Sequence, residues 1–133
     1  MYLFCASFGR VSSWQFDTPG RIGRHFVRDS LGSAIAELQQ EADIEDAFRD
    51  AHLDQDRKGI PGSPSLAETI LCKIEASTVF VADVTPVGNV ANSQKKLINS
   101  NVAIELGYAL KCVTDRGLLM VMNEAYGKRE ELP

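Results

Sequence analysis

Thr78-Val-Phe-Val-Ala82 is the stretch that decides the fold, because it is an unbroken run of apolar, β-branched and aromatic side chains. Ser77 precedes this core stretch and Asp83 follows it, so polar residues bound the run on both sides. Strands of parallel sheets that are covered by helices on both faces have this continuous apolar character. The stretch therefore predicts a central strand of a parallel sheet.

Helix and strand signals alternate on either side of this stretch. A second buried strand is predicted at Gly117-Leu-Leu-Met-Val-Met122, and shorter ones at Tyr2–Cys5 and Ala51–Leu53. A helix is predicted from Ser100 to about Cys112, and another from Ser65, where Glu68 has capping-box spacing. A third begins at Arg21, with an apolar stripe at helical spacing: Ile22, Phe26, Leu31, Ala34, Ile35 and Leu38. This alternation predicts an α/β fold with right-handed β-α-β units.

Composition excludes several classes of protein. The 133 residues fit a single domain, since domains commonly have about 100–150 residues. A net charge of −4 argues against nucleic-acid binding through a basic surface. No apolar run approaches the roughly 20 residues that span a bilayer, and the first residues do not resemble a signal peptide, so we expect a cytoplasmic protein.

Cysteine and histidine usage gives no sign of a metal centre. The three cysteines and two histidines are far apart in the sequence and lack ligand spacing, so we expect no metal site. Cys72 and Cys112 fall within apolar helical patterns, which predicts buried, reduced thiols.

Four polar or Gly/Pro-rich segments fall where the predicted strands end: 12–17, 54–63, 83–89 and 99–105. Ligands of open parallel sheets bind beyond the carboxyl ends of the strands, so these segments predict a site. Glu105 is the one charged residue in Val102-Ala-Ile-Glu-Leu-Gly-Tyr-Ala-Leu110, and Asn101 is predicted to share its helix face. The alternative is a first-turn Glu that only complements the helix dipole.

Other candidate residues also have structural interpretations. Asp83 either caps a turn or presents a carboxylate to the ligand. Arg57, before Gly59-Ile-Pro-Gly62, belongs either to a solvated turn or to a loop that closes on a ligand. Trp14, the single Trp, either packs in the core or stacks on a base.

Four of these segments together resemble the TIR-domain superfamily, and are most similar to bacterial TIR-like proteins described as nucleotide-binding. The matching motifs, in chain order, are Ser13-Trp-Gln-Phe-Asp17, Asp56-Arg-Lys-Gly-Ile-Pro-Gly-Ser-Pro64, Ala82-Asp-Val-Thr85 and Asn101-Val-Ala-Ile-Glu-Leu-Gly-Tyr-Ala109. The resemblance covers roughly residues 13–133. It implies a flavodoxin-like three-layer fold with a central parallel sheet. Because the chain stops at Glu130-Glu-Leu-Pro133, we expect this fold without its last elements.

The resemblance also implies an activity, which is cleavage of the nicotinamide–ribose bond of NAD. NAD is then the substrate, and no cofactor is needed. Glu105 would stabilise the oxocarbenium-like transition state, and Asn101 and Asp83 would position the ribose or Glu105. Ser13, Trp14 and Arg57 would contact the base or the phosphates. TIR–TIR self-association and an NAD-depleting, antiphage role are implied in the same way.

Two alternatives remain open at this point. The helix that contains Glu105 is also similar to that of nucleoside 2-deoxyribosyltransferases, where the carboxylate would be the nucleophile. The other alternative is a non-catalytic module that binds a nucleotide or assembles with other TIR domains. The first eleven residues depart from the TIR pattern, in which the Ser-Trp-Gln segment lies on the first strand.

Overall fold

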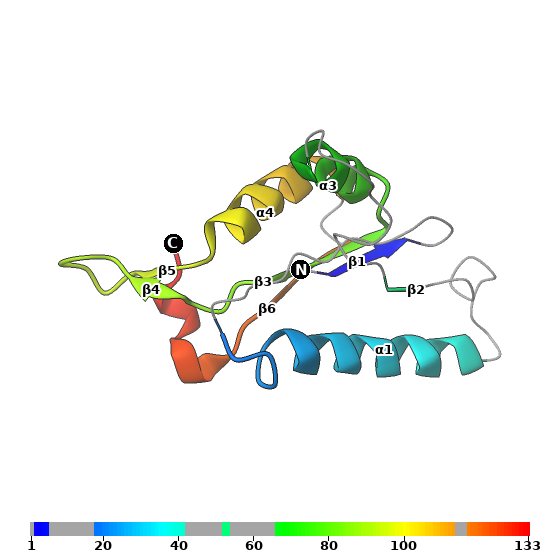
Figure 1. The fold of residues 1–133 in the computed structure, drawn as a ribbon, viewed down its shortest axis with the longest axis horizontal. Coiled ribbons are helices and arrows are strands. Elements are labelled where there is room, and N and C mark those ends of the chain that lie inside the picture. Colours follow the sequence, from blue (N-terminus) through cyan, green and yellow to red (C-terminus); the bar gives the residue numbers. More distant parts are fainter. Residues whose placement is uncertain (1, 6–17, 42–51, 54–65, 114–116) are drawn as a thin grey trace.

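The computed structural model of the chain describes residues 2–5, 18–41, 52–53, 66–113 and 117–133. These residues form a mixed α/β structure (Figure 1). Its α-helices are α1 (Arg24–Gln40), α3 (Leu66–Glu75) and α4 (Ser100–Cys112). Its strands are β1 (Tyr2–Cys5), β2 (His52–Leu53), β3 (Val79–Asp83), β4 (Gly88–Asn89), β5 (Lys96–Leu97) and β6 (Leu118–Val121). The 3-10 helices η2 (Glu124–Tyr126) and η3 (Arg129–Glu131) follow β6. None of the described helices is both long enough and apolar enough to cross a membrane.

The main sheet has the strand order β2-β1-β3-β6. β3 and β6 are parallel, with Phe80 opposite Leu118 and Asp83 opposite Val121. The predicted central position of β3 and its parallel pairing with β6 are therefore confirmed. Gly117 precedes β6 at a point where two backbone segments approach closely. A Cβ at this position would lie 2.3 Å from the Thr78 carbonyl oxygen.

β1 departs from the predicted parallel sheet, because it runs antiparallel to both β2 and β3. The prediction of a parallel sheet throughout is thus wrong at this strand. An unbroken apolar run such as Tyr2–Cys5 identifies a strand but contains no information about its direction. Direction depends on the connections between strands, and antiparallel pairing is slightly the more stable per residue.

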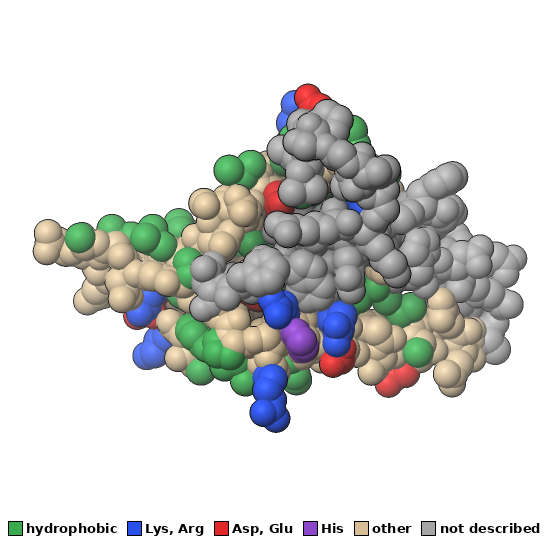
Figure 2. Space-filling view, in the orientation of Figure 1, with side chains coloured by type: hydrophobic (Ala, Val, Ile, Leu, Met, Phe, Trp, Pro, Cys, Tyr) green, Lys and Arg blue, Asp and Glu red, His purple; other side chains and the backbone are tan. Residues whose placement is uncertain are grey.

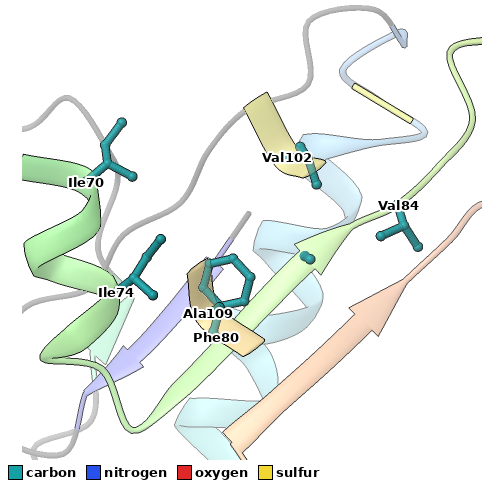
Figure 3. Packing of buried hydrophobic residues seen from close by; sticks show 7 residues of the cluster. Ile70, Ile74, Phe80, Val84, Val102 and Ala109 are labelled. Carbon is teal, nitrogen blue, oxygen red and sulfur yellow. The ribbon is translucent and has the colours of Figure 1, made fainter. Parts of the chain in front are cut away.

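Helices lie on both sides of the sheet: α3 and α4 on one side and α1 on the other (Figure 1). Phe80, Ala82 and Val84 of β3 and its extension pack against α3 and α4. The buried partners on those helices are Ile70, Ile74, Val102 and Ala109 (Figure 3). Successive side chains of a strand point to opposite faces, so Asp83 and Thr85 point toward the α1 side.

Neither Cys72 nor Cys112 is buried, although each lies on a helix that packs against the sheet. Cys72 on α3 and Cys112 on α4 are both exposed and unoxidised. The prediction of buried thiols is wrong because each cysteine lies on the outward face of its helix, beside the buried stripe rather than in it. Ile74 and Ala109 occupy that stripe instead.

α1 buries little of its predicted apolar stripe. Only Ile35 of that stripe is buried, whereas Phe26 is 65% exposed and Ile22 is 48% exposed. The helix also begins three residues later than predicted. The preceding residues form a turn, in which the His25 amide donates to the Gly20 carbonyl at 2.8 Å. Helical spacing predicted the helix correctly, but it does not predict how much of the apolar face another element covers.

Residues 84–99, between β3 and α4, contain a small antiparallel hairpin of β4 and β5. Asn92 has a φ of 57° near the tip of this hairpin. Asn is one of the few residues other than Gly that tolerate this left-handed conformation. Lys95 ties the hairpin to the end of the chain, since its Nζ donates to the carbonyl oxygens of Leu132 at 2.6 Å and Glu130 at 3.3 Å.

Candidate functional site

α4 begins at Ser100, as predicted, because Asn99 caps it. The Asn99 side-chain oxygen accepts hydrogen bonds from the amides of Asn101, at 2.9 Å, and Val102, at 3.4 Å. These amides have no partner within the helix, so the cap satisfies them. The cap fixes where the helix starts, and it thereby fixes which residues of α4 face the sheet.

Glu105 lies in the buried stripe of α4. Its exposed fraction is 6%, and the other buried residues of the helix are Val102 and Ala109. The first turn of α4 contains no acidic residue. The dipole effect falls off within the first turn, so the interpretation of Glu105 as a first-turn helix-dipole partner does not fit. A carboxylate among apolar residues is costly unless it is hydrogen-bonded or has a task.

Two neighbours of Glu105 on α4 are exposed. Asn101 is exposed whereas Glu105 is buried, although the two residues are four apart and lie on the same side of the helix. Gly107 is exposed, and a Cβ there would meet nothing within 4 Å. It therefore does not clear space beside Glu105.

Asp83 ends β3 and is 5% exposed. Its Oδ1 accepts a hydrogen bond from the Thr85 amide at 3.0 Å, which is the turn-capping role considered for it. The same side chain lines a cavity on the α1 side of the sheet. Both interpretations of Asp83 thus describe the same residue: it caps the turn with one oxygen and faces a ligand-sized space.

A set of hydrogen bonds around Asn123 holds this edge of the sheet together. The Asn123 amide donates to Thr85 Oγ1 at 2.9 Å, which joins the ends of β3 and β6. The Asn123 side-chain Nδ2 donates to the Ile22 carbonyl oxygen at 3.2 Å, and its Oδ1 accepts from the Ala125 amide at 3.0 Å. One side chain thereby joins the end of β6 to the segment that leads into α1.

The cavity has a volume of about 650 Å³ and lies between α1 and the carboxyl ends of β3 and β6. This position is the one that ligands take in open α/β sheets, and the volume is within the roughly 300–1,000 Å³ of small-molecule sites. Apolar side chains form most of its wall, and a few polar ones converge at its base. The lining residues are Arg21, Ile22, Gly23, Phe26, Val27, Ser30, Leu31, Asp83, Thr85, Val121, Met122, Asn123 and Glu124.

The predicted site residues are only partly brought together. Asp83 lines the cavity, but Glu105 does not. Asn101 is at the exposed start of α4 and does not line the cavity either. Ser13, Trp14 and Arg57 lie outside the described residues. Sequence reasoning missed Thr85, Asn123 and the beginning of α1, although the strand-end rule pointed to the segment that contains Thr85.

Cationic side chains gather over the first half of α1, beside the cavity (Figure 2). Arg21 lines the cavity itself, and Arg28 forms an exposed ion pair with Asp29 at 2.8 Å. Within the described ranges, no group of three or more His, Cys, Asp or Glu side chains could hold a metal ion. The cavity offers a ligand hydrogen bonds and apolar contacts.

The sequence and the structure were compared with known proteins. No protein-family model, no curated protein and no solved structure matches the chain.

Proposed function

We propose that the chain is an NAD glycohydrolase that cleaves the nicotinamide–ribose bond. The resemblance of four sequence segments to TIR domains suggests this reaction, and the cavity at the carboxyl edge of β3 and β6 supports a nucleotide-sized substrate. In this proposal the fold is flavodoxin-like, the enzyme acts in the cytoplasm, and copies of the chain self-associate.

The reaction needs a negative charge rather than a strong acid. The bond between C1′ of the ribose and the nicotinamide nitrogen breaks, and its electron pair leaves with nicotinamide, which becomes neutral. Water adds to the resulting oxocarbenium-like carbon and releases a proton, giving ADP-ribose. A carboxylate near the ribose stabilises the positive charge that develops in the transition state.

The observation that carries the proposal is the placement of two nearly buried carboxylates close to one end of the sheet. Asp83 ends β3, and Glu105 is in the helix that packs on the same strand. We assign the charge-stabilising role to Glu105 and the ribose-positioning role to Asp83.

The test is incubation of the purified chain with NAD, followed by chromatography for nicotinamide and ADP-ribose. The proposal expects both products in equal amounts, with a yield that rises with protein concentration if self-association completes the site. Nicotinamide release by the wild-type chain, together with its loss in Glu105→Gln, supports the assignment. An intact NAD pool at all protein concentrations, also under crowding, would contradict it.

A specific observation favours a second candidate, a module that binds a nucleotide without cleaving it. Glu105 is buried but does not line the cavity. In that case NAD would bind through the cavity residues and be recovered unchanged. Equilibrium dialysis with NAD, run beside the chromatographic assay, separates this candidate from the glycohydrolase.

A further inference from the structure

Asp83 presents a nearly buried carboxylate to the cavity. The residue is 5% exposed, and its side chain lines the cavity. An ionised carboxylate has about four acceptor positions on its two oxygens, and the Thr85 amide, which donates to Oδ1 at 3.0 Å, occupies one of them. The cavity gives a ligand with hydrogen-bond donors access to the other positions.

The rest of the cavity limits which donors fit. Phe26, Leu31 and Met122 present apolar surface, which suits the flat ring of a base. Arg21 already supplies a cation to the same lining, opposite in charge to Asp83 and Glu124. The group that meets Asp83 is therefore best a neutral pair of donors attached to an apolar ring system.

We infer that Asp83 accepts hydrogen bonds from the vicinal 2′- and 3′-hydroxyls of a ribonucleoside whose base lies against the apolar wall. This inference rests on the proposed function, because it places the ribose of the substrate in this cavity. It also separates the proposed enzyme from a nucleoside 2-deoxyribosyltransferase. A site built around a donor from the 2′-hydroxyl rejects a ligand that lacks this group, since the buried acceptor is then left unpaired.

The ligand-side experiment compares binding of AMP with binding of 2′-deoxy-AMP and 3′-deoxy-AMP to the wild-type chain by calorimetry. Loss of one hydrogen bond to a charged group weakens binding by about 10- to 100-fold, and we expect this loss for each of the two deoxy ligands. The comparison needs no variant, so misfolding cannot obscure it. Equal affinity for AMP and 2′-deoxy-AMP overturns the inference, as does failure of all three to bind.

The protein-side experiment repeats the comparison with Asp83→Asn. Asn keeps the shape and the acceptor for the Thr85 amide but removes the charge, so the preference for AMP should fall to within about 3-fold. Glu37→Gln is the matched control, because Glu37 is an exposed carboxylate of α1 that does not line the cavity. It should keep the full preference. An undiminished preference in Asp83→Asn overturns the inference.

A third ligand tests the main alternative, that Asp83 recognises a cation. The probe is 1-methylnicotinamide, a flat aromatic cation, methylated at the ring nitrogen, without a ribose. Tight binding that Asp83→Asn abolishes, with no dependence of AMP affinity on the 2′-hydroxyl, overturns the inference in favour of cation recognition. The failure of this inference can be told apart from the failure of the proposed function. If the chain cleaves NAD but binds AMP no better than its deoxy analogues, only the inference is refuted. A ribose preference that depends on Asp83, with NAD left intact, refutes only the proposed activity.

Discussion

The two faces of β3 contrast sharply, although they belong to one strand. On the α3–α4 side, Phe80 and Ala82 are completely buried among the side chains of two helices. On the α1 side, Asp83 and Thr85 border a cavity of about 650 Å³, and Phe26 of the covering helix is 65% exposed. Val81, on the same side as Asp83, is also completely buried, so the contrast is confined to the carboxyl end of β3, where Val84 belongs to the core and Asp83 and Thr85 border the cavity. The contrast teaches that a run of apolar residues fixes the strand but not the use of each face.

The largest expected effect tests this contrast with one chemical change made on each face. Phe80→Ala should lower the free energy of unfolding by about 3–5 kcal/mol, because the side chain is fully enclosed and leaves a void. Phe26→Ala should change it by less than about 0.5 kcal/mol, as for exposed residues in general. Urea unfolding followed by circular dichroism measures both. Similar losses in the two variants would show that α1 is packed as tightly as α3 and α4.

The next effect concerns rate rather than stability. Glu105→Gln keeps size and hydrogen-bonding capacity but removes the charge, so NAD cleavage should slow by about 10²–10³-fold, or roughly 3–4 kcal/mol in the barrier. Turnover and melting temperature are measured on the same preparations. Wild-type turnover combined with a lower melting temperature would make Glu105 a structural residue of the closed face.

Asp83→Asn is the partner of that variant, because it changes the nearly buried carboxylate that lines the cavity. We expect it to weaken substrate binding more than it slows the bound substrate, so the KM for NAD rises while kcat changes less. If Asp83→Asn stops turnover and Glu105→Gln does not, then the charge that matters belongs to the cavity face, and the roles of the two carboxylates are exchanged.

The sequence predicts those features of the fold that depend on residues close together in the chain. The core stretch and Gly117–Met122 specify β3 and β6 by composition alone, and the bounds of α4 follow from a local helical pattern. The position of Asp83 beside a cavity was predictable, since the strand-end rule needs only the end of a strand. Glu105 was predictable as unusual, because it is the one charged residue between Val102 and Leu110.

The rest depends on contacts between distant parts of the chain. Asn123 bonds to Ile22 and Thr85, which are 101 and 38 residues away, and no local pattern encodes such a pairing. The direction of β1 and the exposure of the α1 stripe are likewise set by what packs against them. The cavity arises from these arrangements together. The sequence therefore predicts the strand end that borders the cavity, but not the residues of α1 that line it.

A smaller effect concerns the start of α4, one of the two helices that cover the α3–α4 side of the sheet. Asn99→Ala removes the cap of α4 and should lower the free energy of unfolding by about 1 kcal/mol. Asn101→Ala is the control of the same type, two residues on, because the Asn101 side chain is exposed and only its backbone amide takes part in the cap. It should leave melting unchanged. A slower NAD cleavage in Asn101→Ala at unchanged stability would place this residue at the substrate, as the TIR resemblance implies.

The smallest effect lies at the outer surface of the closed face, where α3 and α4 are linked. The Tyr108 hydroxyl donates a hydrogen bond to Glu75 Oε1. This bond, with burial and the negative charge of Glu75, raises the pKa of Tyr108 above its ordinary value of 10.0. The folded state thus favours the protonated phenol, so the stabilisation is fully present below pH 10 and is lost as the pH rises through the folded-state pKa.

Two measurements follow from that sign. In an alkaline titration followed by tyrosinate absorbance, one of the three tyrosines should ionise later in the folded chain than in urea. Tyr108→Phe should remove this late step, and Glu75→Gln, which removes the charge but keeps an acceptor, should shift it to lower pH. The unfolding free energy of wild type should fall above pH 10 more steeply than that of Tyr108→Phe.

Because the link is at the surface, neither substitution should alter the cavity, so AMP binding at neutral pH serves as the control. A weaker affinity for AMP in Tyr108→Phe would mean that the two faces of the sheet are coupled through α4.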